Sequence, residues 1–273
     1  MTENKKKSRR KILKQLGVAT TVTGFAGVGS AKGKSGRSQP EIFDHSVELK
    51  GKNGWNASEW GEYLKQHGIT HESSSTTVSI PKKTTDGDVG TQKFDRNDVT
   101  FEISRGDVTK NRDFCYEYIH LGWNHSAGDV AEWGEAPPDT AAIGFHNDHY
   151  DRSYCDSEWV YYTDDSGNVS DVDGVDSKNP NSGAVCEWAD GGYLNGDTEA
   201  GFGVKLNPKD GYSPSERELE FDYYHTYSDV ELQGISFSFP AGVGVTYGDT
   251  TKVWDVERSF TASQIGNQKT FSP

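Results

Sequence analysis

The sequence has few sulfur-containing residues: three cysteines and one methionine among 273 residues. No two cysteines have the Cys-x-x-Cys spacing, which argues against a zinc site built on these cysteines. Three cysteines allow one disulfide and leave one thiol over, so three pairings stay open. We favour Cys155 with Cys186, because they flank one acidic region whose closure would restrict the unfolded chain.

Familiar catalytic motifs are missing as well. The chain has no Gly-x-Ser-x-Gly, no His-Glu-x-x-His and no glycine-rich phosphate loop before a helix. The sequence therefore gives no support to the commonest serine hydrolases, zinc proteases and nucleotide-binding enzymes.

Long apolar runs and clustered basic residues are absent beyond the N-terminus. No stretch after residue 31 approaches the roughly 20 apolar residues of a membrane helix, so we expect no membrane span. Residues 1–37 contain ten of the 28 basic residues and one of the 42 acidic residues, which leaves the remainder near −23. Nucleic acid is disfavoured as a partner, because phosphate binding needs clustered Lys and Arg.

The N-terminus does contain a recognisable segment. Residues 8–14 are Ser-Arg-Arg-Lys-Ile-Leu-Lys, an apolar stretch covers residues 16–28, and residues 29–31 are small. The segment resembles a twin-arginine signal peptide, with Arg9 and Arg10 as the arginine pair. This resemblance implies that residues 1–31 are a cleaved signal peptide, that the twin-arginine translocase is a partner during export, and that the protein is secreted and extracellular.

The composition supports a second resemblance. The chain is 32% hydrophobic and has a mean hydropathy of −0.79. Its acidic charge is screened when the Debye length shrinks to about 3 Å near 1 M salt. In these properties it is similar to secreted proteins of halophilic archaea, which implies a high-salt habitat. Cys115 is the first cysteine, so we expect release rather than attachment to lipid at the leader.

Residues 32–98 are predicted to form a linker, a short helix and a loop. The linker covers residues 32–40, which are rich in Lys, Gly and Ser. Asn56 and Glu59 have the spacing of a capping box, and Gly68 stands where the helix should end. The loop that follows the helix contains at most one short strand.

Residues 99–273 show apolar residues at every second position. Ile119, Leu121 and Trp123 illustrate this alternation. Comparable runs cover residues 159–162, 184–188, 200–206, 219–223, 235–239, 243–247 and 253–256. About nine or ten short strands with no helical pattern between them predict an all-β fold, an antiparallel β-sandwich or jelly roll with a short N-terminal helix.

An acidic segment between residues 164 and 176 is a candidate cation site. Its carboxylates include Asp165, Asp171, Asp173 and Asp176. Oxygen ligands on a tight loop suit calcium, the one cofactor that we consider, although the full order of an EF-hand loop is absent. An exposed acidic loop explains the same residues.

Three Asn-x-Ser sequons are candidate glycosylation sites. They begin at Asn56, Asn124 and Asn168. Such sites are compatible with a secreted protein.

A histidine group follows the run that ends at residue 145. It comprises His146, Asp148, His149 and Asp151, with His120 and His125 on or just after an earlier strand. Imidazole and carboxylate are zinc ligands. In an extended chain, however, His146 and Asp148 share one face and His149 points to the other. A metal site and a polar loop are therefore both considered.

Glu218, Glu220 and Asp222 occupy alternate positions of one expected strand. They would lie on one face, and neighbouring carboxylates on a strand are spaced near the lower end of the about 5–9.5 Å used in glycoside hydrolysis. Their spacing differs from the pattern of jelly-roll glycosidases, whose third acid comes three residues after the second. A solvated outer face is the alternative interpretation.

Tyrosines are numerous enough to form either a sugar-stacking surface or ordinary core. The candidates are Tyr116, Tyr118, Tyr161, Tyr162, Tyr223 and Tyr224. Because aromatic residues favour any sandwich, core packing is the default.

The predicted function follows from export, a sandwich fold and the lack of a converging catalytic set. We expect a non-catalytic binding or surface-interaction module for carbohydrate or cell envelope. The alternative is a secreted hydrolase, glycosidase-like through Glu218 and Glu220 or metal-dependent around His146. A secreted toxin or antimicrobial protein is a further alternative.

Overall fold

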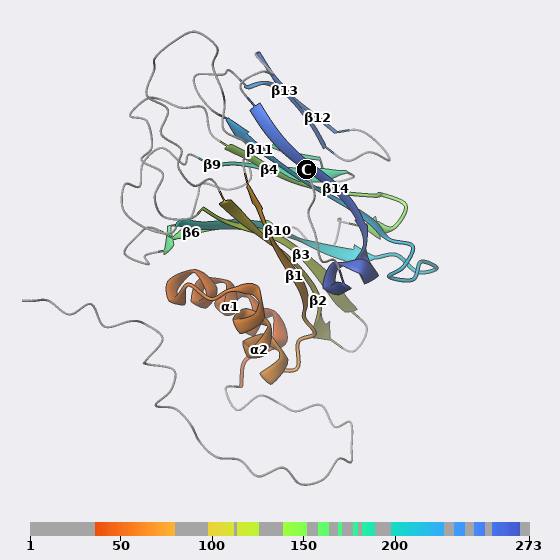
Figure 1. Ribbon diagram of the computed structural model, residues 1–273. Helices are drawn as coiled ribbons and strands as arrows, with labels where there is room; N and C mark the ends of the chain where they lie inside the picture. The colour runs from red at the N-terminus through yellow and green to blue at the C-terminus, as the bar shows by residue number, and fades with distance from the viewer. Residues whose placement is uncertain are drawn as a thin grey trace, which may run out of the picture. The chain divides into compact units, whose positions relative to one another are not determined.

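The computed structural model is described for twelve segments of the chain. They are residues 36–79, 98–111, 114–125, 139–151, 158–163, 169–170, 177–179, 182–188, 198–226, 232–237, 243–248 and 253–267. The chain divides into residues 1–31 and 32–273, and every described residue belongs to the second unit. Within that unit two helices, two larger sheets and a two-stranded sheet are stacked in layers (Figure 1).

The first helix, α1 (Gln39–Asn53), was not predicted from the sequence. It begins inside the expected linker, where Ser38 precedes the helix and its backbone N–H donates to the Glu41 carboxylate at 2.7 Å. Ser38 with Glu41 is a capping box, a signal that was present in the sequence. The buried face of α1 includes Ser46 and Lys50, so no continuous apolar stripe reveals it.

The second helix, α2 (Ala57–Gln66), agrees with the prediction. The side-chain oxygen of Asn56 accepts a hydrogen bond from the backbone of Glu59 at 2.9 Å. Gly68 then adopts a φ of 77°, a left-handed conformation that glycine tolerates and that turns the chain out of the helix.

The first sheet is antiparallel and has the order β1-β2-β3-β10-β6-β7, with β5 also paired to β10. Its strands are β1 (Glu72–Ser79), β2 (Asp98–Asn111), β3 (Phe114–His125), β5 (Tyr150–Asp151), β6 (Glu158–Thr163), β7 (Val169–Ser170) and β10 (Thr198–Pro208). The prediction placed most of β1 in a loop, because its Ser- and Thr-rich sequence lacks apolar alternation. At the edge of the sheet this polar strand needs only β2 as a hydrogen-bonding neighbour.

The second sheet is also antiparallel and has the order β14-β11-β4-β9-β8. Its strands are β4 (Asp139–Phe145), β8 (Ser177–Asn179), β9 (Gly183–Trp188), β11 (Glu218–Thr226) and β14 (Val253–Thr261). The remaining pair, β12 (Leu232–Phe237) and β13 (Val243–Tyr247), forms the two-stranded sheet, and the 3-10 helix η4 (Ala262–Asn267) follows β14.

The core lies between the two larger sheets. Alternate residues of β3 and of β11, such as Leu121 and Phe221, belong to one buried cluster and are at most 1% exposed. Burial of one such side chain stabilises the fold by about 1.5–3 kcal/mol. The all-β prediction is confirmed, and both larger sheets are covered on their outer faces too, by α1 and α2 on one side and by β12 and β13 on the other (Figure 1).

Candidate functional site: a charge-balanced groove

A cavity of about 500 Å³ opens where the end of α2, the start of β1 and the middle of β2 meet. It is lined by Lys65, Gly68, Ile69, Thr70, His71, Glu72, Arg105, Gly106 and Asp107. Lys65 comes from α2, and the antiparallel register of β1 and β2 places Glu72 opposite Arg105. We call this cavity the groove.

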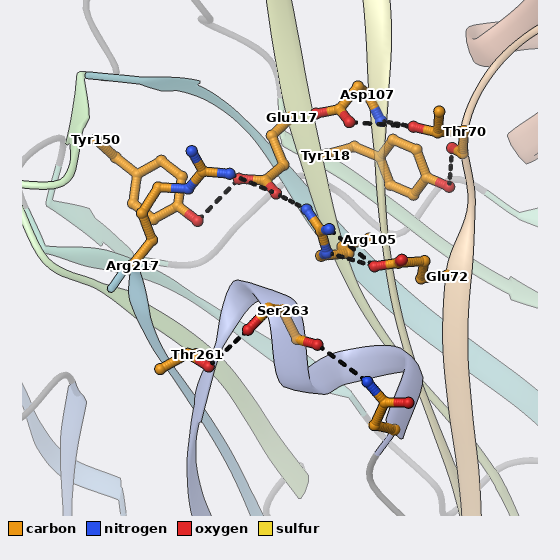
Figure 2. A network of polar contacts seen from close by, with 11 residues as sticks. Thr70, Glu72, Arg105, Asp107, Glu117, Tyr118, Tyr150, Arg217, Thr261 and Ser263 are labelled. Atoms are coloured by element: carbon orange, nitrogen blue, oxygen red, sulfur yellow. Dashed lines mark hydrogen bonds and ion pairs between the residues drawn. The ribbon is translucent and has the colours of Figure 1, made fainter. Parts of the chain in front are cut away.

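One wall of the groove is held by Thr70 and Asp107. The backbone N–H of Asp107 donates to the Thr70 hydroxyl oxygen at 2.7 Å, and that hydroxyl donates to the Asp107 carboxylate at 3.2 Å (Figure 2). Gly106 allows this close approach, because a Cβ there would lie 1.9 Å from the Thr70 carbonyl oxygen. The wall is therefore rigidly placed by contacts between distant parts of the chain.

Next to this contact, along the same two segments of the chain, lies an ion pair between Arg105 and Glu72. Both Nε and Nη2 of Arg105 lie 2.8 Å from Glu72 Oε2, and Nη1 donates to Glu117 behind the groove (Figure 2). Burial lowers the pKa of Arg105, but the negative charges of Glu117 and Glu72 outweigh burial and raise it above its ordinary value. Arg105 is consequently a fixed cation with a set orientation.

A buried carboxylate supports Arg105 from inside the sandwich. Glu117 is 0% exposed and also contacts Arg217 at 3.4 Å, and it accepts a hydrogen bond from the Tyr150 hydroxyl at 2.9 Å. Figure 2 shows Glu117 between the two guanidinium groups. Burial, followed by the charge of Glu117, raises the pKa of Tyr150 well above its ordinary value, so the phenol stays a donor.

These network residues were missed by the sequence analysis, although a signal was available. Glu117 lies two residues before Ile119 in β3, and Arg105 lies two residues after Ile103 in β2, so each shares a strand face with a core residue. Alternation therefore placed both charges on core-facing positions. A buried acid and a buried base at such positions predict an ion pair, which the structure contains.

His71, which also lines the groove, is electrically neutral near pH 7. His71 is 4% exposed, and its Nδ1 is hydrogen-bonded to the hydroxyl of Tyr118. Burial, with a smaller contribution from Lys65, lowers the pKa of His71 to about 4. The imidazole is packed against α2 at Gly61, where a Cβ would lie 2.3 Å from the His71 ring.

The histidine group differs from the extended arrangement that the sequence suggested. Residues 146–149 form a turn in which the His149 N–H donates to the His146 carbonyl at 3.0 Å, and the two rings stack at 4.2 Å. Burial and His149 lower the pKa of His146. Asp148 is exposed, Asp151 lies on β5, and His120 is buried under the helices. The side chain of His125 lies outside the described part.

Glu218, Glu220 and Asp222 do share the outward face of β11, as predicted. Their burial differs: Glu218 is exposed, Glu220 is half-buried and Asp222 is 5% exposed. The purely solvated face that served as the alternative is therefore wrong for Asp222. Burial, then Glu218 and Glu257, raises the pKa of Glu220 to about 6. Burial, then Glu257, Glu220 and Asp255, raises that of Asp222 to about 8.

The tyrosines do not form the sugar-stacking surface considered above, as far as their side chains are described. Tyr116, Tyr118, Tyr223 and Tyr224 are at most 6% exposed, which agrees with core packing. The side chains of Tyr161 and Tyr162 lie outside the described part. Tyr212, on the connection before β11, is the exposed large hydrophobic residue in the described segments, at 39%.

Several sequence-based candidates fall outside the described residues and stay predictions. They are Arg9, Arg10, Cys155, Asp165, Asn168, Asp171, Asp173 and Asp176. Cys186 is buried in β9. Its expected pairing with Cys155 is untested, because Cys155 lies outside the described residues. Asn56 is exposed at the start of α2, and Asn124 is half-buried in β3; glycosylation of either is also untested.

The described segments contain neither a metal centre of three side-chain ligands nor a membrane-spanning helix. No three His, Cys, Asp or Glu side chains there are arranged to hold a metal ion. No described helix is both long and apolar enough to cross a membrane. Comparison of the whole chain with protein-family models, curated proteins and solved structures finds no match.

Proposed function

We propose that this chain is a secreted, extracellular, non-catalytic binding module that holds a carbohydrate of the cell envelope in the groove. The observation that carries the proposal is the charge balance of the groove wall. Two cations, Lys65 and Arg105, are matched by two anions, Glu72 and Asp107, around a neutral His71. A neutral ligand with many hydroxyl groups can donate to the carboxylates and accept from the cations without bringing a net charge.

The fixed geometry of the groove supports binding. Arg105 is held by two carboxylates, and Asp107 is held by Thr70, so neither side chain has to be ordered when a ligand arrives. Preorganised polar groups of this kind reduce the entropic cost of association.

The same contacts disfavour catalysis in the groove. Among its lining residues, the hydroxyl group belongs to Thr70, which is hydrogen-bonded to Asp107 rather than to an imidazole. The carboxylate of Glu72 is bound by a permanently charged guanidinium. Neither arrangement supplies an activated nucleophile or a proton donor poised near neutral pH.

A secreted hydrolase is the second candidate, favoured by one observation on β11. The pKa of Glu220, raised to about 6, suits a general acid, and Glu218 lies two residues away on the same face. Glu218 also donates its backbone N–H to His149 at 3.2 Å, so the histidine turn is adjacent.

Binding and turnover of envelope glycans by the purified protein in about 2–4 M salt test both proposals, since such salt screens the acidic charge. Lys65→Gln should weaken glycan binding by about tenfold, the scale of one hydrogen bond to a charged group. Lys52→Gln is the matched control, because Lys52 is an exposed lysine in the last turn of α1, outside the groove.

Equal binding by wild type and Lys65→Gln would rule out the groove as the binding site. Glycan consumption that Glu220→Gln abolishes without unfolding the protein would replace the binding module with a hydrolase. A wild-type protein that neither binds nor consumes glycan would reject both functions.

A further inference from the structure

The outward face of β11 and β14 collects five carboxylates. They are Glu218, Glu220, Asp222, Asp255 and Glu257. The antiparallel register places Asp222 directly opposite Glu257, with Asp255 opposite Tyr224. This acidic face belongs to the second sheet and is separate from the groove, which is lined by α2, β1 and β2.

Asp222 is unusual among these acids because it is almost completely buried. It is 5% exposed and is paired on its other side with Ala142 of β4, whose side chain lies in the cluster covered by Val243 of β13. Among the described residues no donor or cation bonds its carboxylate, and the charges acting on it are those of Glu257, Glu220 and Asp255. A buried carboxylate that stays charged is normally paired with a cation or bound to a metal, and otherwise it takes up a proton.

Glu257 is oriented by a hydrogen bond from Tyr224. The Tyr224 hydroxyl donates to Oε1 of Glu257 at 2.9 Å. This contact fixes the carboxylate while leaving Oε2 to accept another ligand. Carbon atoms Cβ of directly opposed residues in antiparallel strands are about 4.5–5.5 Å apart. Side chains that start from Cβ atoms at that separation can direct their carboxylates to one ion.

We propose that the outward face of β11 and β14 binds one hydrated divalent cation of the Mg²⁺ class between the carboxylates of Asp222 and Glu257. The described residues contain no set of three side chains arranged around a metal ion. A hydrated Mg²⁺ does not need such a set, since it keeps several waters and uses one or two carboxylates. Glu220 and Asp255, which flank the pair, supply acceptors for those waters.

The test is thermal unfolding of the purified protein with and without millimolar MgCl₂ at constant ionic strength. Wild type should gain about 2–4 °C in Tm, the scale expected when a ligand binds the folded state of a domain of this size. Asp222→Asn should lose this gain, and Tyr224→Phe should reduce it by loosening Glu257. Glu62→Gln, which removes an exposed acid from α2, should retain the full gain.

Equilibrium dialysis with MgCl₂ provides the direct count, in which Asp222→Asn should bind one ion fewer than wild type. If Asp222→Asn does not fold, Glu257→Gln serves in its place, because Glu257 is exposed. A wild-type Tm that does not respond to MgCl₂, or an undiminished response in Asp222→Asn, would overturn the site. A larger gain with CaCl₂ that also depends on Asp222 would overturn the assignment to Mg²⁺.

Discussion

The two outer faces of the sandwich bury charge in opposite ways. Under the helices, Lys50 is 0% exposed, and its ammonium donates to the Trp55 carbonyl at 2.9 Å and to Glu102 at 3.3 Å. Beside the two-stranded sheet, Asp222 is 5% exposed and is acted on only by other acids among the described groups. Burial disfavours the charged form of both groups, but the partners of Lys50 offset this cost, whereas the described neighbours of Asp222 add to it.

The largest effect on stability that we expect comes from replacing Lys50, the buried cation that has partners. Lys50→Ala would leave Glu102 without its cation and open a cavity below α1, so we expect a loss of about 3–5 kcal/mol in the free energy of unfolding. Urea denaturation measures this loss, with the exposed Lys52→Ala as the control. A loss equal to that of the control would show that the buried ion pair contributes nothing.

Replacing Asp222 should raise the free energy of unfolding at pH 8, whereas replacing Lys50 should lower it. Its pKa is about 8 in the folded protein and about 3.9 when unfolded, so the folded state holds a proton that the unfolded state releases as pH rises. The contribution of Asp222 to the free energy of unfolding should therefore fall from about pH 4 to pH 8, and each pKa unit corresponds to about 1.4 kcal/mol. Without divalent cations, Asp222→Asn should be the more stable protein at pH 8.

The measurement is chemical denaturation across that pH range at constant ionic strength. Glu62→Gln controls for the removal of one acid, and its pH profile should follow wild type. A pH profile of Asp222→Asn that also follows wild type would contradict the raised pKa.

The helix-covered face should show the reverse pH dependence. The pKa of His71 is about 4 in the folded protein and about 6.5 when unfolded, so protonation favours the unfolded state as pH falls. The contribution of His71 to the free energy of unfolding should fall from about pH 6.5 to pH 4, and His71→Gln should remove this contribution from the pH profile. His67→Gln, a half-buried histidine on the same layer, is the control. An unchanged slope in His71→Gln would assign the acid sensitivity to other groups.

The strands that could be predicted from the sequence are those with apolar residues at every second position. Leu219, Phe221 and Tyr223 recur at every second position and lie in the core, as expected. Helix α1 and most of strand β1 were not predicted, because the buried face of α1 contains Lys50 and the edge strand β1 is mostly Ser and Thr. Their stability depends on partners rather than on their own pattern.

The candidate sites were less predictable because they depend on distant pairings. Thr70 and Asp107 are 37 positions apart, and Glu117 and Arg217 are 100 apart. The pairing of β1 with β2 brings the first pair together, and the packing of one sheet on the other brings the second pair together. The burial of Asp222 likewise depends on neighbouring strands and on the sheet that covers them. Alternation placed Asp222 on the correct face but could not show what packs beside it.

The smallest effect expected is at the exposed end of the same strand. Glu218, Glu220 and Asp222 are increasingly buried along β11, so the effect of removing charge should increase in that order. Glu218→Gln should change the free energy of unfolding by no more than about 0.5 kcal/mol, as for most surface substitutions. Because Glu218 helps to raise the pKa of Glu220, the variant should also lower that pKa, which NMR titration of the Glu220 carboxyl measures. A loss comparable to that of Lys50→Ala would show that charge on this face matters irrespective of burial, and the contrast between the two faces would fail.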